Sequence, residues 1–162
     1  MIRPATAADT HIIAELIRDL GEYERLTHEV AIDERDLRAN LFGERRYAEV
    51  LLAEDAGEVA GFALFYHGLS TFAAQPSLYL EDIFVRPERR GAGHGRALLA
   101  ELARVAVERG CARIEWRVLD WNEPALAFYR GIGAEPLGDW TTYRLAGDAL
   151  RALAGGAAAT QA

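Results

Sequence analysis

The chain has 162 residues, of which 51% are hydrophobic, and a formal net charge of −7. This length suits one domain that buries its own core, and the negative charge argues against nucleic acid as a partner and favours a small cationic substrate. No apolar run approaches the roughly 18 residues that a membrane span needs, and the first residues lack the pattern of a secretion signal, so we expect a cytoplasmic protein without a membrane partner.

The numbers and positions of cysteine and histidine argue against a disulfide and against a metal site. The single cysteine, Cys111, permits no internal disulfide and agrees with a reducing compartment. The four histidines stand singly, without the spacing of metal ligands, so we expect no metal site. They are His11, His28, His67 and His94.

The N-terminal part of the chain predicts a short strand and two helices. Residues 1–3 begin the strand, and Thr6 with Asp9 three residues later resembles a capping box at the head of a helix that ends near residues 21–23. A second, shorter helix runs over residues 33–41, where aspartates can cap its first turn.

The next part of the chain predicts a hairpin, a loop and a buried strand. The apolar runs 47–53 and 59–66 flank a turn with a glycine and should pair antiparallel. Residues 67–77 show no periodicity, which indicates a loop of about ten residues. Residues 78–85 are almost continuously apolar, which is typical of a strand buried on both faces, and Pro87 ends it.

A glycine-rich turn and a helix follow this strand directly. From Gly91 to Gly95 every second residue is glycine, so backbone N–H groups can point into one concavity at the positive end of the helix. We expect a phosphate there. The chain has no lysine, which excludes a P-loop, and the following strand, 113–118, does not close with the acidic residue that a dinucleotide fingerprint requires. A tight turn without a ligand remains an alternative.

The C-terminal part of the chain predicts a helix, a strand and a tail. Asn122 caps the helix, which glycines end near residues 131–133. Residues 140–145 read as a last strand. The segment 147–162 is rich in alanine and glycine, so we expect a flexible C-terminal tail after a single domain over residues 1–146.

Two separate motifs resemble one family. The loop resembles the Arg/Gln-x-x-Gly-x-Gly/Ala pyrophosphate loop of the GCN5-related N-acetyltransferases (GNAT), and residues 120–134 resemble the helix Asn-x-x-Ala-x-x-Phe-Tyr of the same superfamily. More narrowly, the chain resembles the spermidine/spermine (diamine and thialysine) N-acetyltransferase branch over about residues 1–146, except around 67–77. The segments that carry the narrower resemblance are Ile2-Arg3-Pro4-Ala5-Thr6, Tyr23-Glu24, Leu78-Tyr79-Leu80-Glu81-Asp82 and Trp121-Asn122-Glu123-Pro124.

The resemblance implies a mixed α/β fold, the GNAT-like acyl-CoA N-acyltransferase fold, with six to seven strands and about four helices. It also implies acetyl-CoA as co-substrate and a homodimer. CoA is an anion and the chain is acidic. CoA binding must therefore depend on local features rather than on the electrostatic field of the whole protein. The implied cofactor-binding residues are Ile83, Phe84, Val85, Arg90, Gly91, Ala92, Gly93, His94, Gly95, Arg96, Asn122 and Phe128.

Acetyl transfer to a primary amine needs a base, because an alkylamine with a pKa of about 10.4 is protonated at pH 7. The resemblance points to Glu81 as this base, acting directly or through water, and to Tyr129 as the proton donor to the leaving thiolate. Since adjacent strand residues face opposite sides, Glu81 and Asp82 should not both face the cleft. A structural role and substrate binding both remain open for Asp82. The implied substrate-binding residues are Tyr23, Glu24, Glu81 and Asp82.

The resulting hypothesis is an N-acetyltransferase that acts on a primary amine of a small cationic substrate, such as a polyamine, a diamine or a thialysine-like compound. One alternative is an acetyltransferase for another amine, on an amino acid, an antibiotic or a protein N-terminus. The other is a non-catalytic module that binds acyl-CoA, against which the presence of both Glu81 and Tyr129 argues.

Overall fold

The structure is a computed structural model that describes residues 1–139 and 141–159 of the chain. It divides into two compact units, Met1–Arg117 and Val118–Ala162. In the described residues, no helix is long and apolar enough to cross a membrane. The boundaries of a single domain over 1–146 stay a prediction.

The first unit contains one five-stranded sheet with the strand order β1-β2-β3-β4-β5. The first four strands pair antiparallel in succession, and β4 pairs with β5 in parallel. Their bounds are β1 (Ile2–Pro4), β2 (Glu49–Asp55), β3 (Glu58–Ser70), β4 (Gln75–Val85) and β5 (Ile114–Trp116). The mixed α/β class is confirmed, whereas the predicted six to seven strands are five among the described residues.

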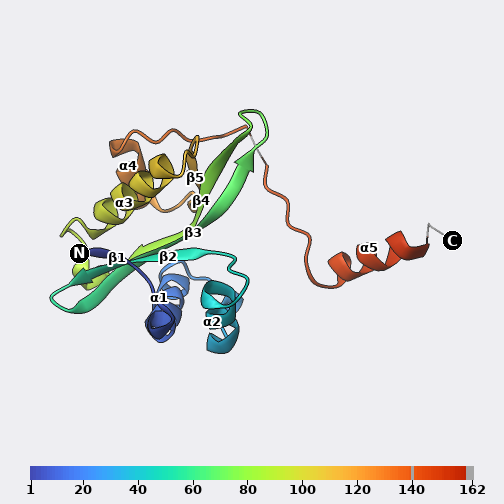
Figure 1. The fold of residues 1–162 in the computed structure, drawn as a ribbon, viewed down its shortest axis with the longest axis horizontal. Coiled ribbons are helices and arrows are strands. Elements are labelled where there is room, and N and C mark those ends of the chain that lie inside the picture. The colour runs from blue at the N-terminus through green and yellow to red at the C-terminus, as the bar shows by residue number, and fades with distance from the viewer. Residues whose placement is uncertain (140, 160–162) are drawn as a thin grey trace. The chain divides into compact units, whose positions relative to one another are not determined.

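Helices cover both faces of this sheet (Figure 1). On one face lie α1 (Thr10–Tyr23) and α2 (Glu34–Phe42), and on the other lies α3 (His94–Glu108), which connects β4 to β5. Three short 3-10 helices complete the unit: η1 (Ala7–Asp9), η2 (Thr27–Glu29) and η3 (Pro87–Arg89). With α4 (Glu123–Gly131) and α5 (Gly147–Ala159) of the second unit, the described residues form five α-helices rather than about four.

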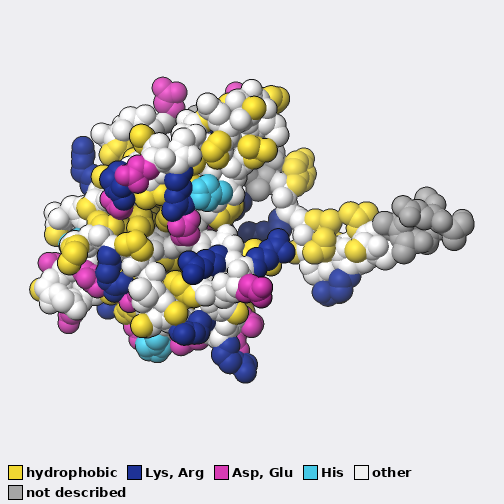
Figure 2. All heavy atoms as spheres, in the orientation of Figure 1, with side chains coloured by type: hydrophobic (Ala, Val, Ile, Leu, Met, Phe, Trp, Pro, Cys, Tyr) yellow, Lys and Arg dark blue, Asp and Glu magenta, His cyan; other side chains and the backbone are white. Residues whose placement is uncertain are grey.

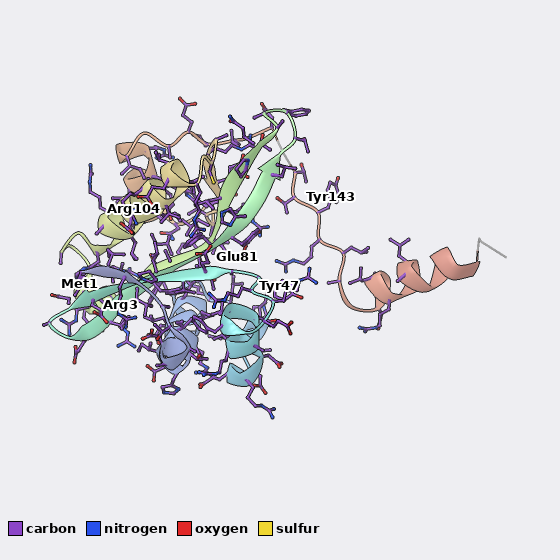
Figure 3. All side chains as sticks on the ribbon, viewed as in Figure 1. Met1, Arg3, Tyr47, Glu81, Arg104 and Tyr143 are labelled. Carbon is purple, nitrogen blue, oxygen red and sulfur yellow. The ribbon has the colours of Figure 1, made fainter. Side chains whose placement is uncertain are left out.

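Local capping sets where the first two helices begin. The Thr6 N–H donates to Asp9 Oδ2 at 2.7 Å in the predicted capping box, which caps η1, and η1 runs directly into α1. Asp33 caps α2 by accepting the backbone N–H of Arg35 at 2.8 Å. These bonds satisfy N–H groups that have no partner within the helix. Arg3 on β1, labelled in Figure 3, ties the helix start to the sheet through an ion pair with Asp9 at 2.8 Å.

Each face of the sheet buries its own apolar layer. The layer under α1 and α2 contains Ile13, Leu16, Leu20, Leu41, Val50, Leu52, Phe62 and Phe84. The layer under α3 contains the buried residues Leu98, Leu99, Leu102, Val105 and Ala106 of that helix. Burying one such side chain fully stabilises the fold by about 1.5–3 kcal/mol, so the two layers hold the sheet in a fixed position between the helices.

The predicted loop over residues 67–77 is wrong, because both strands continue through it. His67 pairs with Leu78 and Ser70 pairs with Gln75, so only residues 71–74 form the turn. Pro76, which suggested a loop, lies within β4 opposite Leu69. Its carbonyl accepts the N–H of Ala112 at 2.9 Å, and the N–H that proline lacks is not required there.

The second unit contains α4 (Glu123–Gly131) and α5 (Gly147–Ala159). Residues 141–145 form no strand, since a strand needs a pairing neighbour; Trp140 of the predicted strand lies outside the described residues. Residues 147–159, expected to be frayed, form helix α5, which agrees with alanine being the strongest helix former. The flexibility of the segment stays a prediction, and residues 160–162 lie outside the described residues.

Candidate active site

One edge of β4 loses its neighbour half-way along the strand. The pairing with β5 covers only Leu78, Tyr79 and Leu80, which lie opposite Ile114, Glu115 and Trp116. From Glu81 to Val85 the strand pairs with β3 alone within the first unit. This open edge leaves backbone groups of a central strand without a strand partner, which is the arrangement that an extended ligand can complete.

The hydrogen-bond pattern shows which backbone groups reach the open edge. The Arg86 N–H donates to the Ala60 carbonyl of β3 at 2.9 Å. Because successive residues of a strand direct these groups to opposite sides, Val85 and Ile83 point away from β3 and Phe84 points toward it. The Val85 carbonyl indeed accepts from Arg90 Nε at 3.0 Å, outside the sheet. The backbone of Ile83 and Val85 is therefore directed to the open edge, while the Phe84 ring is buried in the core.

A β-bulge places both carboxylates of β4 on the same face. Leu64 pairs with Asp82 and Phe65 pairs with Leu80, so Glu81 is an extra residue in β4. Leu64 packs against the layer under α1 and α2, and its partner Asp82 shares that face. The expectation that adjacent residues must face opposite sides is therefore wrong here, because the bulge inserts one residue into the alternation.

The charges around the bulge confirm that these groups lie close together. Burial, followed by the charges of Glu81 and Glu24, raises the pKa of Asp82 to about 6. Burial also raises the pKa of Glu24. Burial and then the charge of Glu81 raise the pKa of Tyr66 on β3. Glu81, marked in Figure 3, thus lies between a tyrosine and an aspartate whose titration it affects.

We call Glu24, Glu81 and Asp82 the acidic cluster. Within the described part of the chain, none of the three carboxylates forms an ion pair with an arginine or a histidine. By contrast, Glu49 on β2 forms an ion pair with Arg109. Neighbouring carboxylates repel one another when ionised, and burial adds to the cost. A bound cation, such as a protonated amine, would stabilise their ionised form.

The glycine-rich turn has the backbone conformation that the sequence predicted. Gly91 and Gly93 both adopt left-handed conformations, with φ of 83° and 86°, and Gly93 is the N-cap of α3. A Cβ added at either glycine would meet no atom within 4 Å, so the space in front of the loop is open. Alternating left-handed residues at a helix N-terminus form a concave N–H nest that fits a pyrophosphate.

The side chains of this loop point in different directions. His94 turns toward β2, where its buried Nε2 lies 3.6 Å from Asp55 Oδ2. Arg90 lies over the ring of Tyr23. Ala92 and Arg96 are exposed, and Gly95 is half-buried. Arginine and acidic side chains are interspersed over the face shown in Figure 2, so an anionic ligand must be recognised by this local nest rather than by a broad basic surface.

Three predicted site residues belong to the second unit. Asn122 is buried and caps α4 by accepting the Ala125 N–H at 3.4 Å. The rings of Phe128 and Tyr129 lie 5.5 Å apart between centroids. The motif therefore forms the expected capped helix, and the catalytic and cofactor-binding roles of its residues stay predictions.

Sequence reasoning missed a pair of tyrosines beside the acidic cluster. Tyr66 on β3 lies opposite Tyr79 on β4, and their ring centroids are 5.3 Å apart. They flank the bulge at Glu81. The pair could have been found only from the strand register, because Tyr66 stands at the end of an apolar run where a loop was predicted to start.

Comparison with known proteins identifies the family. The model of the acetyltransferase (GNAT) family matches residues 12–134, which is more than half of the chain. The chain belongs to this family. It is therefore an acetyltransferase, as the resemblance implied, and the family uses acetyl-CoA as co-substrate. The left-handed glycines and the open edge of β4 fit such a ligand, since both offer backbone donors to an elongated anion.

Individual relatives support this membership. The chain is 42% identical to thialysine N-epsilon-acetyltransferase of Bos taurus, over 96% of this chain and 97% of the relative. It is 32% identical to L-ornithine N5-acetyltransferase NATA1 of Arabidopsis thaliana, over 94% of this chain and 86% of the relative. Among solved structures, an integron cassette protein from the mobile metagenome of V. cholerae superposes with a TM-score of 0.80 at 27% identity, covering 95% and 96% of the two chains.

Proposed function

We propose that this protein transfers the acetyl group of acetyl-CoA to a primary amine of a small cationic substrate, in the class of diamines, polyamines and thialysine-like diamino acids. The observation that carries the proposal is the acidic cluster, in which two carboxylates of the open half of β4 lie near Glu24 at the end of α1 and none forms an ion pair among the described residues. The curated relatives act, by their names, on thialysine and on L-ornithine, which both carry a terminal amine on an amino acid.

The donor side of the proposed site is built from backbone. Acetyl-CoA supplies the acetyl group as an activated thioester. The nest of Gly91 and Gly93 would hold the pyrophosphate, with Arg90, Ala92, His94, Gly95 and Arg96 around it. The Ile83 and Val85 backbone would bind the extended arm, as one strand binds another, and a free N–H there could polarise the thioester carbonyl. Asn122 and Phe128 are proposed to complete the cofactor contacts.

The acceptor side is built from side chains. Glu24 and Asp82 would bind the ammonium group that does not react, with Tyr23 as a wall. Glu81 would take the proton from the reacting amine, directly or through water, so that the neutral amine can attack. Tyr129 would donate its phenolic proton to the leaving thiolate. A phenol with a pKa near 10 protonates a thiolate with a pKa near 8.5 at a cost of about 2 kcal/mol, which an enzymatic barrier tolerates.

An amine panel tests the proposal directly. Purified protein is incubated with acetyl-CoA and thialysine, ornithine, spermidine or 1,3-diaminopropane, and thiol release is followed against time. Matched controls are the same compounds already acetylated on the terminal amine, an aminoglycoside, and a peptide with a free N-terminus. We expect turnover of the dications and none of the blocked compounds. Faster turnover of the peptide, or of a neutral amine, would contradict the proposed substrate class.

We further propose that the protein acts in the cytoplasm, as a homodimer and without a metal, with no nucleic acid or membrane partner. The single cysteine and the net charge of −7 support the compartment and the partners, and the family resemblance supports the dimer. Light scattering on the purified protein measures the oligomeric state, and activity after dialysis against a chelator tests the metal independence.

A further inference from the structure

Arg90 contacts three parts of the site at once. Its guanidinium carbon lies 4.3 Å from the ring centroid of Tyr23 and 5.7 Å from that of Phe84. Its Nε donates to the Val85 carbonyl at 3.0 Å, on the open edge of β4. It is also the residue directly before Gly91, the first glycine of the nest. The side chain therefore joins the end of α1, the open strand edge and the pyrophosphate loop.

The ring that Arg90 covers ends the helix that carries one member of the acidic cluster. Tyr23 is the last residue of α1, and Glu24 follows as its C-cap, with its N–H bonded to the Leu20 carbonyl at 2.9 Å. Arg25 then adopts a left-handed φ of 61°, so the chain turns sharply away. Only this short turn separates the Tyr23 ring from the Glu24 carboxylate, and the charge of Glu24 already reaches Asp82, where it raises the pKa.

The Tyr23 ring contacts both a core ring and the loop arginine. Its centroid lies 6.2 Å from that of Phe84 and 4.3 Å from the Arg90 guanidinium carbon, which itself lies 5.7 Å from the Phe84 centroid, so the three groups form one cluster. The planar, charged guanidinium of an arginine stacks favourably on an aromatic ring. Its N–H groups can donate a hydrogen bond at the same time. Removing the guanidinium would take away the stacking contact between the loop and the last residue of α1.

We infer that Arg90 is a positioning residue that couples the acetyl-CoA loop to the acceptor-binding end of α1. The inference rests on the proposed function, because it assigns the acceptor to the acidic cluster. A donor that orders the Gly91–Gly95 loop fixes Arg90, Arg90 fixes the Tyr23 ring, and the ring fixes Glu24. The acceptor should therefore bind more tightly when the donor is present, and by linkage the donor should bind more tightly when the acceptor is present.

A double-mutant cycle between Arg90→Gln and Tyr23→Leu tests this coupling. With saturating acetyl-CoA, we expect Arg90→Gln to raise the acceptor KM by about 2- to 10-fold, the range of a stacked arginine, with kcat changed by less than about twofold. Tyr23→Leu should do the same, and the double variant should lose no more than the larger single effect. Arg90→Lys, which keeps the cation over the ring, should recover part of the acceptor KM.

Arg45→Gln is the matched control. Arg45 also stacks on a tyrosine, Tyr47, with its guanidinium carbon 5.0 Å from the ring centroid, and neither residue is near the acidic cluster in sequence or in any contact described above. This variant should leave the acceptor KM unchanged. An effect as large as that of Arg90→Gln would show that loss of any stacked arginine perturbs the assay, and would overturn the inference.

Two further outcomes would also overturn the coupling. Additive effects of the two substitutions would show that Arg90 and Tyr23 act independently. A lower acceptor KM in Arg90→Gln would show that the guanidinium competes with the cationic acceptor for the Tyr23 face.

A cycle without turnover separates this inference from the proposed function. Thermal unfolding of the wild type, the two single variants and the double variant is measured with and without CoA. We expect the Arg90–Tyr23 interaction to be non-additive, and more so with CoA bound. If the wild type acetylates no amine of the panel, the proposed substrate class fails, while this cycle still decides whether Arg90 couples the loop to α1.

Discussion

The two halves of β4 differ although they belong to one strand. Residues Leu78–Leu80 pair with β3 on one side and β5 on the other, and Leu78 and Leu80 are buried. Residues Glu81–Val85 pair with β3 alone, and a bulge turns two carboxylates onto one face. The comparison shows what distinguishes the candidate site: a neighbouring strand ends early, and one inserted residue changes which side chains share a face. The paired half should then determine stability and the open half activity.

The largest expected effect lies in the open half. Glu81→Gln should lower kcat/KM by about 10²- to 10⁴-fold at neutral pH, the usual contribution of a general base. The defect should shrink at high pH, where the amine loses its proton without help. Rates are measured from pH 6 to 10, with Glu44→Gln, an exposed glutamate on another segment, as control. A defect confined to the acceptor KM would show that Glu81 only binds the substrate.

Tyr129→Phe tests whether catalysis needs the proposed proton donor, which belongs to the second unit. Removing the phenolic proton and keeping the ring should lower kcat by about 10²-fold with little change in the affinity for CoA. Raising the pH should not rescue this variant, because the missing proton belongs to the leaving group. A near wild-type kcat across the pH range would remove Tyr129 from the proposed mechanism.

Leu78→Ala addresses the paired half. Leu78 is fully buried, so its truncation should lower the free energy of unfolding by about 2–5 kcal/mol. The KM values measured well below the unfolding temperature should stay unchanged. Leu69→Ala, in the same hairpin but with 69% of the side chain exposed, should cost less than about 0.5 kcal/mol. Loss of catalysis without loss of stability in Leu78→Ala would break the division between the halves.

Gly93→Val separates backbone strain from ligand binding. The left-handed φ of 86° makes any side chain unfavourable, by about 1–2 kcal/mol. Gly110→Val is matched to it, because Gly110 also has a left-handed φ, of 65°, and open space around it, at the other end of α3. Both variants should lose similar stability, but calorimetry should show weaker acetyl-CoA binding, by about tenfold or more, only for Gly93→Val. Equal affinities would refute the nest.

Asp82→Asn should raise stability rather than lower it. The pKa of Asp82 is raised from 3.8 to about 6, so the folded protein holds this proton more tightly than the unfolded chain does. Its ionisation therefore costs stability as the pH rises between these values, and the cost is complete above pH 6. The variant should be more stable than the wild type by up to about 3 kcal/mol at pH 7.5, and no more stable below pH 4. Chemical denaturation at the two pH values measures this; a constant difference would disprove it.

Local signals in the sequence predicted the turn and the caps that depend on local chemistry. The Gly91–Gly95 loop, the capping box of Thr6 and Asp9 and the cap of Asn122 are each set by residues a few positions apart. The bulge at Glu81 could not be predicted in this way, since it depends on how β3 and β4 align over their whole length. The same holds for the Tyr66–Tyr79 pair, because the hairpin that sets its register was taken for a loop.

Donor recognition through backbone atoms has an evolutionary consequence. Substitutions at Ile83 and Val85 leave their N–H and C=O groups in place, so the donor side can tolerate many sequences as long as Gly91 and Gly93 are kept. In the proposed site, the acceptor side depends on the identity of a few side chains, Glu24, Glu81 and Asp82 among them. Selection can therefore change the amine that is accepted without losing the acetyl donor, and a library randomised at Tyr23, Tyr66 and Tyr79 is the place to look for new acceptors.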